Sequence, residues 1–132
     1  MSQTYYNELY ITMDTDHSQG YVEGFVTEND DSVIEYLDVY GEDENVMRDI
    51  LSSHHRVAVL KNIKVEGGRN KGVGSSLLGK ALGAIDSENA GLIVLIADEY
   101  EDNPFSLEKW YSGYGFETVM HINQGPIMVL EL

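Results

Sequence analysis

The sequence contains no cysteine and only two prolines. The absence of cysteine excludes a disulfide framework, a zinc site built on thiolates and a cysteine nucleophile. Long hydrophobic runs are missing too: no apolar stretch approaches the ~20 residues that span a bilayer, and no basic-then-apolar leader opens the chain. With 132 residues, 42% of them hydrophobic, the chain has the size and apolar content of one domain with a packed core. We therefore expect a single soluble, cytoplasmic domain over residues 1–132.

Positive charge is scarce and unevenly distributed. The formal net charge is −15, and residues 1–47 carry twelve Asp and Glu but no Lys or Arg. Such an acidic chain repels nucleic acid and anionic membranes, so we expect neither as a partner. Seven of the eight bases fall within residues 48–80: Arg48, Arg56, Lys61, Lys64, Arg69, Lys71 and Lys80. Because this basic block surrounds a glycine-rich segment, it indicates an anionic ligand as readily as a solvated face.

The first part of the chain is mainly typical of strands. Residues 8–13 and 21–26 flank a polar stretch and predict a hairpin. Residues 33–40 are rich in β-branched and aromatic side chains and predict a third strand, although the spacing of their apolar residues also suits a helix turn. Residues 42–53 open with acids and continue with an apolar stripe, which predicts a short helix.

The middle of the chain predicts a βαβ unit. Residues 56–66 begin as a continuous apolar run, which is typical of an interior strand. After a glycine-rich turn, apolar residues recur at helical spacing from Val73 to about Asn89. Residues 92–97 are apolar on both faces, as in a buried parallel strand. This order of strand, turn, helix and buried strand defines the unit.

The last part of the chain completes the predicted fold. A helix follows Pro104 at about residues 105–114. Residues 116–122 and 127–132 then alternate around a short turn and predict a closing hairpin. The expected fold class is α+β, with a mixed and mostly antiparallel sheet around the central βαβ unit.

The glycine-rich turn is a candidate anion site. A helix N-terminus presents unpaired N–H groups and the positive end of its dipole, and glycines let an anion approach that backbone. Two phosphate motifs fail here. The dinucleotide fingerprint has Leu77 in place of its last glycine, and the P-loop spacing has Ala81 in place of its Ser or Thr. The pattern that fits is R-x-x-G-x-G over residues 69–74.

This turn resembles the acetyl-CoA-binding turn of the GNAT family of N-acetyltransferases. A second segment, Trp110-Tyr111-Ser112-Gly113-Tyr114-Gly115-Phe116, resembles the late helix of that family, which ends in aromatic-Tyr-x-x-x-Gly-Phe. The resemblance covers about residues 56–132, and it implies a GNAT-like acyltransferase fold. The helical region of the N-terminal half is shortened, because one early helix is predicted where the family usually has two.

The resemblance implies acetyl-CoA as cosubstrate and no metal. The backbone amides from Asn70 to Ser75 would cradle the pyrophosphate, and the backbone of two strand residues would bind the pantetheine arm. Asn103 matches an asparagine that often contacts CoA in the family, although it also suits a plain helix start. The implied cofactor-binding residues are Ile63, Val65, Arg69, Asn70, Lys71, Gly72, Val73, Gly74, Ser75 and Asn103.

Tyr111 occupies the position of the family's frequent general acid, which protonates the departing thiolate. Packing within the late helix is the simpler interpretation, and the Gly-Phe ending together with the upstream turn favours the functional one. Some members place a glutamate base in the strand before the turn, and this chain has no carboxylate between Arg56 and Val65. The alternatives for a base, if there is one, are Glu66, Asp98, Glu99, His54 and His55.

The acidic N-terminal part predicts a cationic amine as acetyl acceptor: a protein lysine, a polyamine or a polycationic antibiotic. The closing hairpin often supports dimers in the family, so a homodimer is compatible with the resemblance. The alternative function is a non-catalytic GNAT-like binding or regulatory module, or an acidic mimic of nucleic acid. The missing strand carboxylate favours this alternative, and Tyr111 with the intact turn favours the enzyme.

Overall fold

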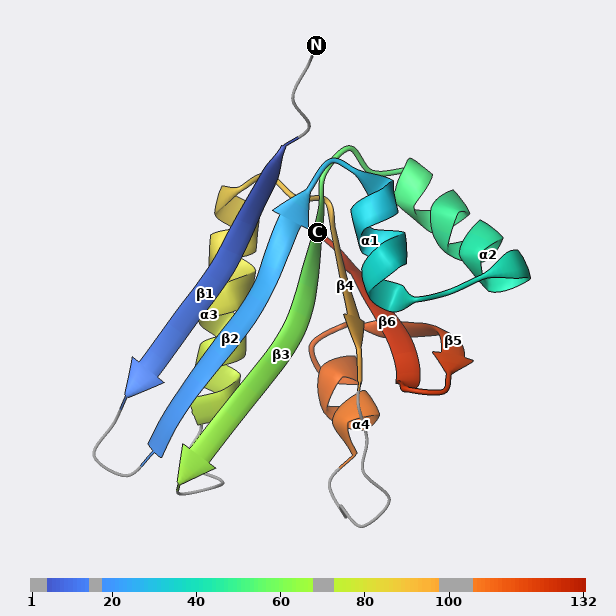
Figure 1. Cartoon of the computed structure of the whole chain (residues 1–132). Coiled ribbons are helices and arrows are strands. Elements are labelled where there is room, and N and C mark those ends of the chain that lie inside the picture. Colours follow the sequence, from blue (N-terminus) through green and yellow to red (C-terminus); the bar gives the residue numbers. More distant parts are fainter. Residues whose placement is uncertain (1–4, 15–17, 68–72, 98–105) are drawn as a thin grey trace.

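A computed structural model describes residues 5–14, 18–67, 73–97 and 106–132 (Figure 1). In these ranges the chain forms six strands and four helices, in an α+β fold with a mixed sheet. The elements are, in order, β1 (Tyr6–Asp14), β2 (Ser18–Thr27), α1 (Asp30–Leu37), α2 (Gly41–Ser52), β3 (Val57–Gly67), α3 (Val73–Ser87), β4 (Leu92–Ile96), α4 (Leu107–Ser112), β5 (Glu117–Ile122) and β6 (Gly125–Glu131). The predicted fold class is confirmed.

The strands are ordered β1-β2-β3-β4-β6-β5 across the sheet. β3 and β4 are parallel and are joined by α3, so the predicted βαβ unit is confirmed. The other neighbouring strands are antiparallel, including the β1–β2 and β5–β6 hairpins that the sequence predicts. No helix among the described residues is long and apolar enough to cross a membrane.

Two hydrophobic clusters cover the two faces of the sheet. Because side chains alternate along a strand, Ala58 and Leu60 of β3 pack with the cluster that contains α3. Val57 and Val59 pack on the other face, with the cluster that contains α1 and α2. The start of β3 and the whole of β4 are therefore buried between two helical layers, as their continuous apolar sequences predict.

The strand prediction for residues 33–40 is wrong, because Asp30–Leu37 forms helix α1. The side-chain oxygen of Asn29 accepts a hydrogen bond from the backbone N–H of Asp31 at 3.0 Å and caps the helix. The apolar residues of α1 are buried at helical spacing, and Asp38 ends the helix with a φ of 56°. The N-terminal part thus holds two short helices, α1 and α2, where one was expected.

β3 and β4 pair over only part of their length. Their register runs from Val57 opposite Leu92 to Leu60 opposite Leu95. β3 then continues to Gly67, paired with β2 alone in the described part of the chain. Figure 1 shows the two strands diverging beyond this point. The gap between β3 and β4, as we call this opening, begins at Lys61.

Candidate active site

The backbone that the resemblance assigns to binding of the pantetheine arm lies along the gap between β3 and β4. Ile63 and Val65 both lie on β3 beyond its last pair with β4. Toward β2 their backbones are opposite Val22 and Gly20. The geometry that the prediction requires, a strand edge released from its parallel neighbour, is therefore present. The binding of pantetheine at these two residues stays a prediction.

Tyr111 is held by the fold at the end of α4. Its side chain is only 7% exposed and belongs to the cluster on the α3 face of the sheet. Its ring lies 5.0 Å from that of Trp110 and 5.5 Å from that of Phe116, centroid to centroid. Gly115 has a φ of +101°, a conformation that L side chains rarely adopt, and it turns the chain so that Phe116 packs back onto Tyr111. The Gly-Phe ending is therefore a structural support for Tyr111.

Burial, and to a smaller extent the electrostatic effect of the Tyr36 phenol, together raise the pKa of Tyr111 to about 12. The hydroxyl therefore carries its proton at neutral pH. A group with such a pKa can donate a proton to a departing thiolate, and it cannot serve as a base under the same conditions. The role of Tyr111 as a general acid stays a prediction.

Tyr36 is a site residue that the sequence analysis missed. It lies on α1 and packs against the cluster on the opposite face of the sheet from Tyr111. Its hydroxyl donates a hydrogen bond to the backbone carbonyl of Lys61 at 3.4 Å, and its ring meets Phe25 edge-on at 6.3 Å. Tyr36 thus marks the start of the gap from one face. The interpretation of residues 33–40 as a strand concealed it, and the Asn-Asp-Asp helix start is the signal that could have found it.

Glu23 is a carboxylate on β2, one strand away from the gap, that contacts a β3 residue at the gap. It lies on β2 opposite Asn62, and the Asn62 side-chain amide donates a hydrogen bond to its Oε1. Asn62 is two residues past the last β3–β4 pair. The sequence analysis considered a carboxylate only within the strand that holds Asn62. A carboxylate on the neighbouring strand could not be found in that way.

The glycine-rich turn is described only at its ends. Arg69, Asn70, Lys71 and Gly72 lie outside the described residues, as does Asn103. β3 ends at Gly67 and α3 begins at Val73, so the turn leads into a helix of 15 residues as predicted. Gly74 and Ser75 lie in the first turn of α3, which contains no acidic residue. A helix start without a carboxylate is suited to an anion.

Of the predicted base candidates, only His54 and His55 are described with their side chains, and neither lies at Tyr111. His54 and His55 precede β3, at the end of the strand away from the gap. There, Nε2 of His54 lies 3.6 Å from Glu131 and Nε2 of His55 lies 3.1 Å from Glu28. Among the remaining candidates, Asp98 and Glu99 lie outside the described residues, and the side chain of Glu66 is not described. No cluster of three or more His, Asp and Glu side chains in the described ranges is placed to hold a metal ion.

No protein-family model and no curated protein sequence matches the chain. The fold is similar to that of two solved structures. The crystal structure of the anti-CRISPR protein AcrVA5 has a TM-score of 0.53 at 15% identity, over 92% of this chain and 98% of that one. The PaiA N-acetyltransferase from Thermoplasma acidophilum, solved in complex with coenzyme A, has a TM-score of 0.51 at 12% identity.

The second match covers 87% of this chain and 60% of the PaiA chain, so the protein spans little more than half the length of that enzyme. At such low identities, likeness of structure defines the fold alone. The chain therefore has a GNAT-like fold, which is the fold class that the sequence predicts.

Proposed function

We propose that the protein is an N-acetyltransferase that moves an acetyl group from acetyl-CoA to a primary amine of a cationic acceptor. The observation that carries this proposal is Tyr111, a buried phenol whose raised pKa keeps it protonated in a GNAT-like fold. If the residue at position 111 served packing alone, phenylalanine would suffice. Thioester cleavage needs a protonated group to donate to the departing sulfur, and we assign this role to the Tyr111 hydroxyl.

The proposed cofactor site runs from the start of α3 to the gap. The backbone amides of the turn, from Asn70 to Ser75, would bind the pyrophosphate, with Arg69 and Lys71 adding positive charge. The backbone of Ile63 and Val65 would bind the pantetheine arm. The absence of acidic residues from the first turn of α3 and the release of β3 from β4 both support this path.

The reaction needs three proton transfers. The acceptor ammonium loses one proton, and the neutral amine then attacks the thioester carbonyl. As the C–S bond breaks, the new amide nitrogen loses a second proton to solvent and the sulfur gains one. Tyr111 donates its proton to the departing sulfur and regains one from solvent. We assign the first proton to water held near Glu23, the carboxylate that accepts a hydrogen bond from Asn62 of β3. A backbone N–H near Val65 would stabilise the developing oxyanion.

Isothermal titration with acetyl-CoA, with ATP as the control ligand, tests the cofactor site. We expect micromolar binding, about −8 kcal/mol. Gly72→Glu should abolish it, because a carboxylate would fill the pyrophosphate site. Gly79→Glu is the matched control: it adds the same charge on α3, where a Cβ meets no atom within 4 Å. No binding at millimolar acetyl-CoA would refute the proposal and favour the non-catalytic module.

A further inference from the structure

Beyond the part that α1 and α2 cover, one face of the β1–β2–β3 sheet carries aromatic and acidic side chains. Leu9, Ile11 and Met13 of β1 pack toward α3, and the residues between them point to the other face. Figure 1 shows α3 behind these three strands and their front open. The residues that point to this face, here called the aromatic-acidic face, are exposed or half-buried: Tyr6, Glu8, Tyr10, Thr12, Asp14, Gln19, Tyr21, Glu23, Asn62 and Lys64.

Large aromatic rings lie in a row on this face. Tyr10 is 65% exposed and stacks on Tyr21 of the adjacent strand, with ring centroids 5.8 Å apart and planes inclined by 24°. Tyr6 is 53% exposed and stacks on Phe25 at 5.3 Å. Such rings, left in contact with water on neighbouring strands, are typical of an interaction surface.

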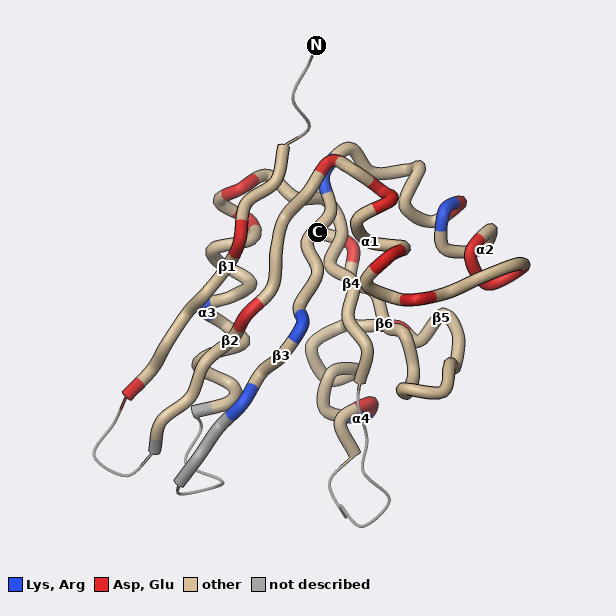
Figure 2. Tube along the Cα trace, in the orientation of Figure 1, with Lys and Arg blue, Asp and Glu red and all other residues tan. Residues whose placement is uncertain are grey.

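The charges on this face indicate a cationic partner. Glu8, Asp14 and Glu23 alternate with the tyrosines, and Lys64 is the one base in the set. Figure 2 shows acidic positions along β1 and β2, and among these three strands the basic positions lie on β3. Carboxylates pair with ammonium and guanidinium groups, and the face of a tyrosine ring attracts the same cations. The net charge of −15 opposes the pairing of two copies through this surface.

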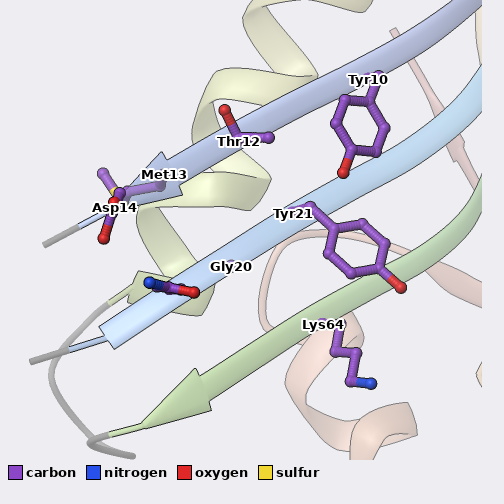
Figure 3. A pocket seen from close by; sticks show the side chains of 8 residues that line it. Tyr10, Thr12, Met13, Asp14, Gly20, Tyr21 and Lys64 are labelled. Carbon is purple, nitrogen blue, oxygen red and sulfur yellow. The ribbon is translucent and has the colours of Figure 1, made fainter.

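A shallow cavity of about 330 Å³ lies at one end of the aromatic-acidic face. It is lined chiefly by Tyr10, Thr12, Asp14, Gln19, Tyr21 and Lys64, whose arrangement is shown in Figure 3. Lys64 belongs to the stretch of β3 that runs beyond its pairing with β4. A side chain seated in the cavity would therefore lie beside the strand that forms one edge of the gap.

The length of the face favours a polypeptide over a small amine. Nine residues of β1 span about 30 Å, which matches an extended peptide of about nine residues. We propose that the aromatic-acidic face binds an extended, lysine- or arginine-rich segment of a protein and presents one of its lysines to the gap as the acetyl acceptor. This inference rests on the proposed function and names its acceptor class.

The test measures peptide binding without acetyl-CoA. The probe is a fluorescein-labelled peptide of about eight residues with alternating Lys and Ser. Its binding is measured by fluorescence anisotropy. Tyr10→Ser and Glu8→Gln should each weaken binding by about tenfold. Their matched controls are Tyr40→Ser, whose ring is 73% exposed outside this face, and Asp86→Asn, an exposed acid on α3. Both controls should bind as the wild type does.

Equal losses in a variant and its control, or no loss in Tyr10→Ser, would overturn the proposal. So would displacement of the peptide by spermine at equal charge concentration, which would indicate a polyamine site. A dimer in sedimentation analysis that Tyr10→Ser dissociates would assign the face to a second copy. Titration of the same proteins with acetyl-CoA separates the two proposals: peptide binding through this face without acetyl-CoA binding would refute only the acetyltransferase.

Discussion

Removal of one oxygen atom from Tyr111 should stop the chemistry and leave the fold intact. In Tyr111→Phe the ring keeps its contacts with Trp110 and Phe116, so the core loses no volume. At about pH 8, roughly four units below the pKa of about 12, only about one Tyr111 side chain in 10⁴ is ionised. Loss of a proton donor in this state should lower kcat by about 10²- to 10⁴-fold.

The assay follows release of the CoA thiol with a lysine-rich acceptor at saturating acetyl-CoA, and calorimetry measures the acetyl-CoA Kd separately. We expect kcat to fall and the Kd to stay unchanged. Tyr114→Phe is the matched control, because it removes the hydroxyl group of a half-buried neighbour. The ring centroid of Tyr114 lies 5.4 Å from that of Trp110. If Tyr111→Phe turns over as fast as Tyr114→Phe, the general-acid role is refuted.

Tyr36→Phe tests the contribution of the opposite face to the same group. The phenol of Tyr36 raises the pKa of Tyr111, so its removal should lower that pKa. The measurement is an alkaline titration monitored by tyrosinate absorbance. The difference between the curves of Tyr36→Phe and the Tyr36→Phe/Tyr111→Phe double variant isolates the Tyr111 transition and shows its shift. An unchanged Tyr111 transition would indicate that the two phenols do not interact.

Three further predictions concern stability. Gly24→Ala should destabilise the fold by about 3 kcal/mol in urea unfolding, because its Cβ would lie 2.1 Å from the Val59 carbonyl oxygen; an unchanged midpoint would contradict the close approach. The hydrogen bond from Arg56 lowers the pKa of Glu28 below 4.5, so stability should be present above that pH and fall as pH drops through the folded pKa; Glu28→Gln should flatten this slope in acid unfolding curves. The raised pKa of Tyr111 should cost up to about 3 kcal/mol of stability between about pH 10 and 12, where the unfolded state ionises first, and an equal loss in Tyr111→Phe would refute this assignment.

The second half of the fold could be predicted from sequence because its signals are local and strong. The apolar run of β4 is buried on both faces, and the 3.6-residue periodicity of α3 extends over 15 residues. α1 could not be assigned in the same way. It has eight residues, among them β-branched Val33 and Ile34, and its cap at Asn29 is the feature that distinguishes it from a strand.

Some site residues could likewise be predicted from local sequence signals, and others could not. Tyr111 follows from a contiguous motif, and its burial agrees with the supporting role of Gly115. Tyr36 and Glu23 depend on tertiary structure, because each reaches the gap from an element distant in sequence: Tyr36 meets Lys61, 25 residues away, and Glu23 meets Asn62, 39 residues away. No local pattern encodes such pairs. The turn residues from Arg69 to Gly72 and Asn103 remain predictions from the resemblance.

The most direct test of the proposed activity is mass spectrometry of a lysine-rich peptide after incubation with the protein and acetyl-CoA. We expect acetyl groups to accumulate on lysine side chains and CoA thiol to be released in equal amount, and we expect Tyr111→Phe nearly to abolish both. A wild-type protein that binds acetyl-CoA and leaves every amine unmodified would contradict the enzyme. The GNAT-like fold would then serve as a binding module.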